Sequence, residues 1–87
     1  MSVKLIIDDN DLTKILNNES EMYSVVENCI ADITGVVETH QLIFQDIETH
    51  DFYSVYYEYV PDTALQWISV PIKVIKKSIT TEYWIEQ

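Results

Sequence analysis

The clearest hydrophobic pattern in the chain runs from about Asp11 to Ile33 and has the period of an α-helix. The apolar side chains that share its stripe are Leu12, Ile15, Leu16, Met22, Tyr23, Val26, Ile30 and Ile33. Asp8-Asp9-Asn10-Asp11 supplies capping side chains for a helix start, and Gly35 can take the left-handed conformation that ends a helix. The pattern therefore predicts one long amphipathic helix, with a break near Asn17-Asn18 as an alternative.

Two later segments, 39–47 and 52–60, are rich in β-branched and aromatic residues and are separated by a polar turn, which predicts an antiparallel β-hairpin. Glu48 is placed opposite Asp51 across that turn. The neighbours expected from this register are Phe44 with Val55, Leu42 with Tyr57, His40 with Tyr59, Ile43 with Tyr56 and Ile47 with Phe52. Both faces of the hairpin carry large apolar groups, so both need a cover, and the helix can supply one.

The remaining apolar segments are short. Alternation over residues 3–7 predicts an N-terminal strand, and residues 65–70 predict a further strand after the hairpin. Residues 71–80 fit either a helix or a strand, and residues 83–85 predict a terminal strand. The expected fold class is α+β in a single domain of residues 1–87. In it, a small antiparallel sheet of three to five strands packs against one long N-terminal amphipathic helix, with a second short C-terminal helix as an alternative.

Charge changes this picture more than any motif does. The 87 residues include 15 acidic residues, five lysines and no arginine, for a formal net charge of −10. No lysine or arginine lies between Lys14 and Lys73, whereas the acidic residues there are Glu19, Glu21, Glu27, Asp32, Glu38, Asp46, Glu48, Asp51, Glu58 and Asp62. Few of these carboxylates have a cation nearby in the sequence, so most are expected to face water or a binding partner.

The sequence favours a binding protein over an enzyme. It contains no nucleophile elbow, Walker loop or dinucleotide-binding fingerprint, and its single glycine cannot build a phosphate-binding loop. Asp8, Asn10 and Glu19 fit three positions of a calcium-binding loop, but Leu12 and Thr13 stand where that loop needs an oxygen ligand and a glycine. Helix capping is the preferred interpretation. No metal and no cofactor are expected.

Cysteine and histidine give no sign of a site. Cys29 is the single cysteine and cannot form an intrachain disulfide. An extended segment separates His40 from His50, so the two are not expected to share a metal. No apolar run resembles a signal peptide or a membrane span, which predicts a cytoplasmic protein.

Aromatic residues crowd the second strand of the hairpin, as Tyr53, Tyr56, Tyr57 and Tyr59, and Trp67 lies on the next predicted strand. Core packing between strands is the simpler interpretation, and a protein interface is the functional one. Stacking on nucleic acid also uses aromatics on strands, but it needs basic residues beside them, and the interleaved residues here are acidic. Direct binding to nucleic acid or to an anionic membrane is therefore not expected.

An acidic surface can instead compete with nucleic acid for a basic site. Residues i and i+2 on one strand face, such as Asp46 and Glu48, stand roughly 6.5–7 Å apart, close to two 3.4 Å steps of the charge spacing of DNA. The surface expected to bind the partner consists of Asp46, Glu48, Asp51, Tyr56, Glu58, Asp62, Glu21 and Asp32. The leading hypothesis is a DNA-mimic inhibitor that occupies the basic site of a nucleic-acid-binding protein or nuclease.

In size, acidity and aromatic content the chain is similar to the small acidic anti-defence inhibitors of phages and mobile elements, which block nucleases, glycosylases, restriction enzymes or CRISPR effectors. The resemblance implies a class of function and assigns a role to no residue. Two alternatives stay open. One is an immunity protein or antitoxin that neutralises a basic toxin. The other is a structural or regulatory homo-oligomer, such as a homodimer, that buries the apolar face of Ile43, Ile47, Phe52 and Tyr56 against a second copy.

Overall fold

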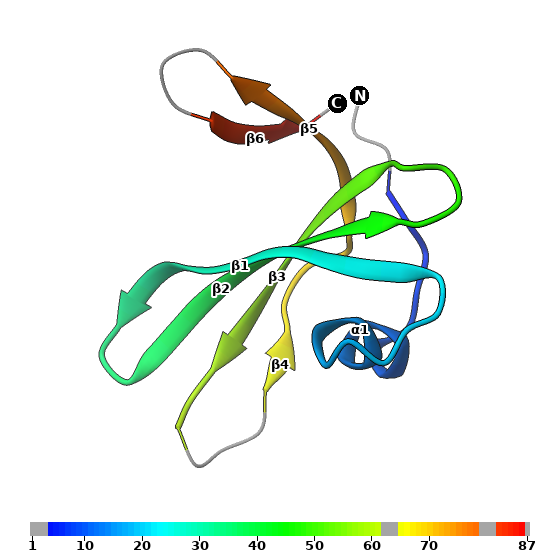
Figure 1. Ribbon diagram of the computed structural model, residues 1–87. Helices are drawn as coiled ribbons and strands as arrows, with labels where there is room; N and C mark the ends of the chain where they lie inside the picture. The colour runs from blue at the N-terminus through cyan, green and yellow to red at the C-terminus, as the bar shows by residue number, and fades with distance from the viewer. Residues whose placement is uncertain (1–3, 62–64, 79–81, 87) are drawn as a thin grey trace.

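The computed structural model describes residues 4–61, 65–78 and 82–86, which form one short helix and a curled antiparallel sheet (Figure 1). In chain order the elements are α1 (Asp9–Leu16), β1 (Tyr23–Thr34), β2 (Val37–Asp46), β3 (Phe52–Tyr59), β4 (Gln66–Trp67), β5 (Ile72–Ser78) and β6 (Glu82–Glu86). Neighbouring strands follow the order β1-β2-β3-β5-β6, and β4 also pairs with β3. The fold is mostly β, so the predicted α+β arrangement around a long N-terminal helix is wrong.

The helix α1 contains eight residues and ends at Leu16. At its start, the side chain of Asp8 accepts the backbone N–H of Asp11 at 2.8 Å, which confirms the predicted cap. After its end, Asn18 adopts a positive φ of 60°. The hydroxyl of Ser20 then accepts the backbone N–H groups that lead into β1. The predicted continuation of the helix to Ile33 is therefore wrong.

The second half of the predicted helix forms β1, a strand of 12 residues. Its register against β2 shifts at Val26 and at Ala31, each of which is an extra residue in the ladder. The side chains of β1 that share one face are consequently Tyr23, Val25, Asn28, Ile30 and Ile33, at alternating intervals of two and three residues. This average interval lies between the strand period of 2 and the helix period of 3.6. The two bulges therefore gave the apolar residues of β1 a spacing that the sequence analysis interpreted as helical.

The β1–β2 hairpin turns at Gly35 and Val36. Gly35 has a φ of 62°, and Thr34 and Val37 pair on either side of the turn. A two-residue hairpin turn with glycine at its first central position requires this conformation. The left-handed conformation predicted for Gly35 is therefore present, but it closes a hairpin and does not end a helix.

The predicted hairpin is confirmed as β2 and β3, with its register moved by two residues. The observed neighbours are Phe44 with Tyr53, Leu42 with Val55, His40 with Tyr57, Ile43 with Ser54 and Gln45 with Phe52. The turn is longer than predicted because Asp46 and Asp51 close it, and the Asp46 carboxylate accepts the N–H groups of Glu48 and Thr49 at 2.8 and 3.1 Å. A shift of two residues leaves every side chain on its predicted face.

Strands β4 and β5 follow one another along the edge of β3 that β2 leaves open. Between them, the hydroxyl of Ser69 accepts the backbone N–H of Tyr56 at 2.9 Å, so a side chain replaces one ladder bond. The strand predicted over 65–70 is therefore reduced to the two residues of β4. β5 resolves the ambiguity after Pro71 in favour of a strand, and the alternative of a C-terminal helix is wrong within the described residues.

The two ends of the chain also join the sheet. β6 confirms the predicted terminal strand and pairs with β5. The predicted N-terminal strand is reduced, among the described residues, to a bridge between Lys4 and Ile72 and a bond from the Leu5 N–H to the Pro71 carbonyl at 2.9 Å. Both ends therefore lie beside β5.

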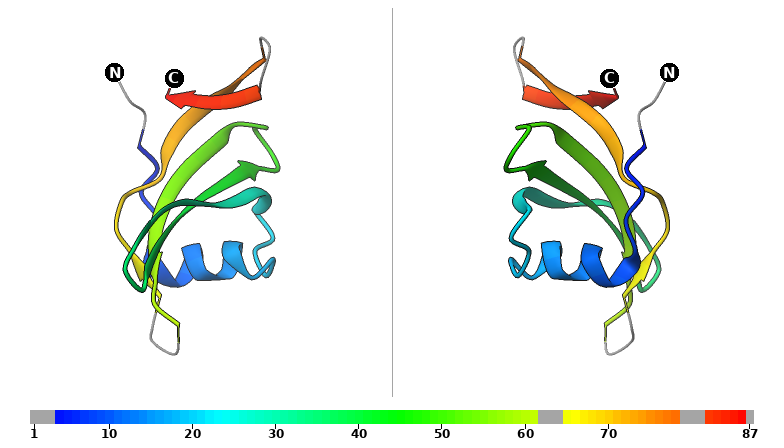
Figure 2. Two further views of the ribbon diagram at one scale, coloured as in Figure 1. Left: turned by 90° about the vertical axis from the view of Figure 1, so that its left-hand side faces the viewer. Right: turned by 90° about the vertical axis from the view of Figure 1, so that its right-hand side faces the viewer.

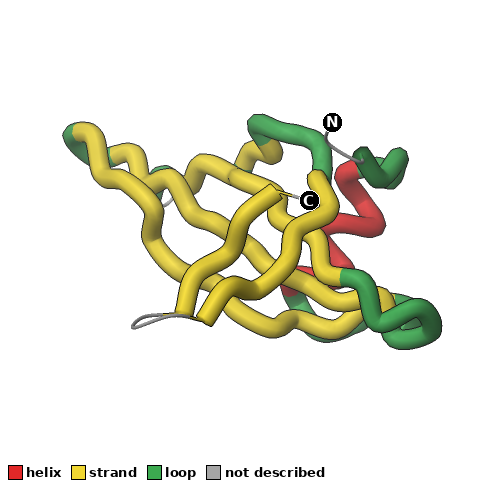
Figure 3. The backbone as a smooth tube through the Cα atoms, turned by 90° about the horizontal axis from the view of Figure 1, so that it is seen from above, coloured by secondary structure: helices red, strands yellow, loops and turns green. Residues whose placement is uncertain are grey.

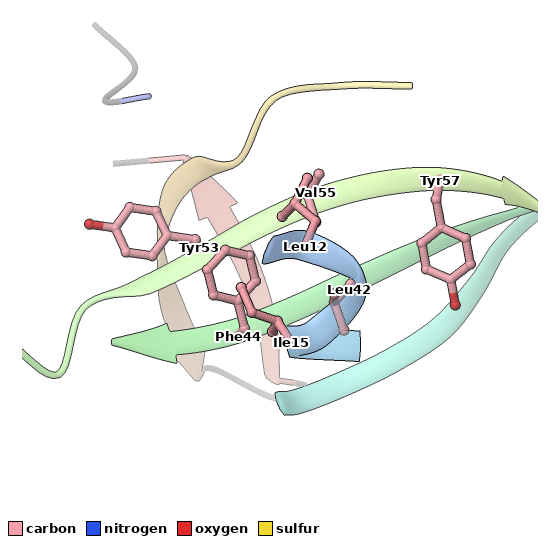
Figure 4. Packing of buried hydrophobic residues seen from close by; sticks show 7 residues of the cluster. All are labelled: Leu12, Ile15, Leu42, Phe44, Tyr53, Val55 and Tyr57. Atoms are coloured by element: carbon pink, nitrogen blue, oxygen red, sulfur yellow. The ribbon is translucent and has the colours of Figure 1, made fainter. Parts of the chain in front are cut away.

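The core lies between α1 and one face of the sheet, called here the helix face. Its cluster consists of Leu12, Ile15, Leu42, Phe44, Tyr53, Val55 and Tyr57. Figure 4 shows Leu12 and Ile15 of the helix pointing at the strands, with Tyr53 and Tyr57 at the two ends of the cluster. The helix thus covers one face of the hairpin, and for these two tyrosines the core interpretation is confirmed.

The opposite face, called here the inner face, is covered in part because the sheet curls and brings β6 across it (Figures 2 and 3). Trp84 packs against Phe52 with ring centroids 4.9 Å apart, and its Nε1 donates to Glu27 Oε2 of β1 at 2.8 Å. Ile43 is fully buried on the same face. Two members of the apolar face predicted to bind a second copy, Ile43 and Phe52, are therefore covered within the chain.

Candidate partner-binding surface

Four of the predicted binding residues lie at or beside the turn between β2 and β3, a region called here the hairpin tip: Asp46, Glu48 and Asp51 of the turn and Glu21 just before β1. Glu21, Asp46 and Glu48 line one shallow hollow of about 160 Å³. The carboxylate of Asp46 has a structural role there, because it caps the turn. Glu48 lies in the turn and not on a strand, so the predicted pair of carboxylates at i and i+2 on one strand face is not formed.

Lysines lie among the acidic residues on this side of the molecule. The Lys73 ammonium lies 3.4 Å from the Asp51 carboxylate. Lys14, in the last turn of α1, lines the same hollow of about 540 Å³ as Asp8 and Asp11. The negative charge of the hairpin tip is therefore partly compensated within the chain, and a lysine lies near the carboxylates of the helix start.

The opposite end of β1, β2 and β3, called here the open end, projects away from β5, β6 and both termini (Figure 1). On its inner face, Asp32, Thr39 and Glu58 form one row across the three strands. Paired Cα atoms in such rows lie roughly 5 Å apart, so Asp32 and Glu58 are separated by about 10 Å at the backbone. Glu38 precedes Thr39 on β2 and belongs to the helix face. The open end therefore carries carboxylates on both faces.

No lysine whose side chain the structure describes belongs to the open end. These lysines are Lys4 before the helix, Lys14 on α1 and Lys73 on β5. Lys76 and Lys77 also lie on β5, which pairs with the other end of β3. The described cations and the open-end carboxylates are thus separated along the molecule.

The other predicted binding residues have different positions. Tyr56 lies on the inner face opposite Gln41, with 38% of its surface exposed. Tyr59 is equally exposed but belongs to the helix face. Asp62 lies outside the described residues. The predicted set therefore divides into the four residues of the hairpin tip and, on the inner face, Asp32, Tyr56 and Glu58.

An aromatic cluster on the helix face of the open end was missed by the sequence analysis. The rings of His40 and Tyr57 stack with centroids 4.9 Å apart and planes at 9°, and the His40 Nε2 lies 2.9 Å from Glu38 Oε1. The Tyr57 hydroxyl donates to Asn28 Oδ1 at 3.0 Å, and the ring of Tyr59 meets His40 edge-on at 6.3 Å. The signal for this cluster was the spacing of Glu38 and His40, because residues at i and i+2 of a strand share a face.

Three tyrosines of the helix face hold their protons more tightly than free tyrosine does. Burial, the largest cause, raises the pKa of Tyr23, Tyr53 and Tyr57 above the ordinary value of 10.0. The carboxylates of the hairpin tip add to the increase in the pKa of Tyr23 and of Tyr53, because they oppose a second negative charge nearby.

These pKa shifts predict loss of stability in alkali. A raised pKa in the folded state favours the neutral tyrosine, so its stabilising contribution is complete below the unfolded-state pKa of about 10 and is lost as pH rises through the folded-state pKa. We expect the free energy of unfolding, measured in urea between pH 8 and pH 11, to fall with a smaller slope in Tyr53→Phe than in the unaltered chain. The two proteins differ only at residue 53, so equal slopes would contradict the prediction.

Comparisons with known proteins assign no function to this surface. Among the described residues, no three His, Cys, Asp or Glu side chains gather as a metal site, and Cys29 is exposed. Within the same residues, no helix has the length and apolar character needed to cross a bilayer. No protein-family model, no curated protein and no solved structure matches the chain. A function can therefore be proposed only from the chemistry of its surface.

Proposed function

We propose that this chain inhibits a nucleic-acid-binding protein or nuclease by placing the carboxylates of the open end in the partner's basic site. One observation carries the proposal: Asp32, Glu38 and Glu58 gather at an end that holds none of the described lysine side chains, whereas Lys14 and Lys73 lie among the carboxylates elsewhere. Carboxylates with no lysine beside them leave negative charge for a basic groove to bind.

The spacing of these carboxylates suits a site made for phosphates. The backbone separation of about 10 Å between Asp32 and Glu58 is close to three 3.4 Å steps of the charge spacing along one DNA strand. Both residues are held on hydrogen-bonded strands, so little backbone order has to be gained on binding. Tyr56, exposed on the same face, supplies an aromatic anchor of the kind that interfaces favour.

The net charge of −10 supports the same mechanism at longer range. It attracts a basic partner before contact and speeds their association, and dissolved salt screens this attraction over about 10 Å at 0.1 M. Binding should therefore be rapid at low salt and should weaken as salt is added.

Affinity capture with a DNA competitor tests the proposal. The immobilised chain is incubated with cell lysate at low and at high salt, with and without duplex DNA, and bound proteins are identified by mass spectrometry. We expect basic nucleic-acid-binding proteins that DNA displaces and that high salt releases. Capture confined to proteins that neither DNA nor salt displaces would refute the proposed function.

A further inference from the structure

A hollow of about 330 Å³ lies on the helix face of the open end, beyond the last turn of α1. The residues that line it are Leu16, Asn28, Glu38, His40, Tyr57, Tyr59 and Leu65. Pockets that enclose a drug-sized ligand measure about 300–1,000 Å³, so this hollow is at the lower end of that range. It is suited to one long side chain of a partner protein.

The floor of the hollow is held in place by contacts from several sides. Tyr57 stacks on His40, meets Trp67 edge-on with ring centroids 5.1 Å apart, and donates its hydroxyl to Asn28. Trp67 in turn lies 3.3 Å from the Thr13 hydroxyl of α1, to which its Nε1 donates. Such support means that little side-chain order has to be gained when a ligand binds.

Charge and ring chemistry favour a planar cation in this hollow. Glu38 is the one acidic residue among those that line it, none of them is a lysine, and the Glu38 side chain is 31% exposed. His40, 2.9 Å away, orients that carboxylate. The exposed ring of Tyr59 offers a flat surface beside it. A guanidinium group can pair with the carboxylate and stack on an aromatic ring at the same time, whereas a lysine ammonium is a compact point charge.

We infer that the hollow receives one arginine side chain of the basic partner, an assignment that rests on the proposed function for the existence of that partner. The guanidinium binds the Glu38 carboxylate and stacks on Tyr59, and the aliphatic stem packs on Leu16 and Leu65. This arginine enters from the helix face, while Asp32 and Glu58 act on the inner face. The partner therefore contacts the open end on both faces of the sheet.

A small-molecule titration tests the assignment without the partner. N-acetyl-arginine methylamide is added to the isotopically labelled chain, and NMR follows the His40 ring and the Asn28 side-chain amide. N-acetyl-citrulline methylamide, which has a similar shape and no charge, is the comparison. We expect saturable shifts in the millimolar range for arginine and binding at least about fivefold weaker for citrulline. Absence of saturable shifts with arginine, or equal affinity for the two, would overturn the assignment.

Matched variants identify the carboxylate. Glu38→Gln should weaken arginine binding at least about fivefold, whereas Glu48→Gln, with the same charge change at the hairpin tip, should alter it less than about twofold. Equal losses would mean that overall charge and not the hollow attracts arginine. If DNA-sensitive capture succeeds and the arginine probe fails, the inference is refuted and the proposed function stands. If the probe succeeds and capture fails, the hollow binds guanidinium but the proposed inhibitor function is refuted.

Discussion

Replacing Phe44 by alanine should lower the free energy of unfolding by about 3–5 kcal/mol. The Phe44 side chain is fully buried, meets Tyr23 edge-on at 5.3 Å and stacks on Tyr53 at 5.6 Å. It belongs to the same core cluster as Ile15 (Figure 4), so alanine would leave a cavity between the sheet and α1. Domains are stable by only roughly 0.05–0.15 kcal/mol per residue, so a chain of 87 residues would lose much of its stability.

Urea unfolding followed by circular dichroism measures this loss, and Ile47→Ala is the matched control. Ile47 belongs to the same hairpin but is half exposed at the tip, so its truncation should change stability by less than about 0.5 kcal/mol. A similar cost for the two variants would contradict a core placed between α1 and the helix face.

Neutralising the inner-face row of the open end should weaken partner binding about tenfold. In the double variant Asp32→Asn, Glu58→Gln each lost charge pair is expected to cost up to about 1 kcal/mol, since the carboxylates are at least partly exposed. The loss should appear at low salt and should shrink as salt is added, because screening already weakens the interaction there. Titration calorimetry with the protein identified by DNA-sensitive capture measures the loss of affinity and its dependence on salt.

The control for this double variant changes charge equally at the other side of the molecule. Glu21 and Glu48 are both exposed and belong to the hairpin tip. Glu21→Gln, Glu48→Gln should weaken binding about twofold or less, through the loss of long-range attraction alone. If the control lost as much affinity as the open-end variant, the net charge of the protein would explain binding and the location of the carboxylates would not.

The hairpin could be predicted from the sequence because its signals are local. β-branched and aromatic residues fill β2 and β3, and the polar turn lies between them. The register of the hairpin could not be predicted, because it depended on whether the Asp46 side chain would cap a longer turn. The helix was predicted too long for a similar reason: bulges at Val26 and Ala31 are set by pairing with β2, which a single strand does not reveal.

The candidate surface was only partly accessible to sequence reasoning. The long stretch without lysine indicates exposed carboxylates, but chain order does not tell which of them meet a lysine after folding. Lys73 lies close to Asp51 because β5 pairs with β3. Asp32 and Glu58 lie in one row because each pairs with Thr39 of β2, the strand between theirs. The stacking of His40 on Tyr57 depends on the same register, so it could not be anticipated from a hairpin placed two residues away.

The interrupted ladder of β1 opposes fibril formation through this strand. In the described part of the chain, β1 pairs only with β2, so its other edge is open, and several of its apolar side chains are exposed. Such a strand would ordinarily recruit identical strands from other molecules. The two extra residues divide it into regular runs of 23–25, 27–30 and 32–34. Cross-β stacking requires flat segments of about six residues, so none of these runs is long enough to seed it.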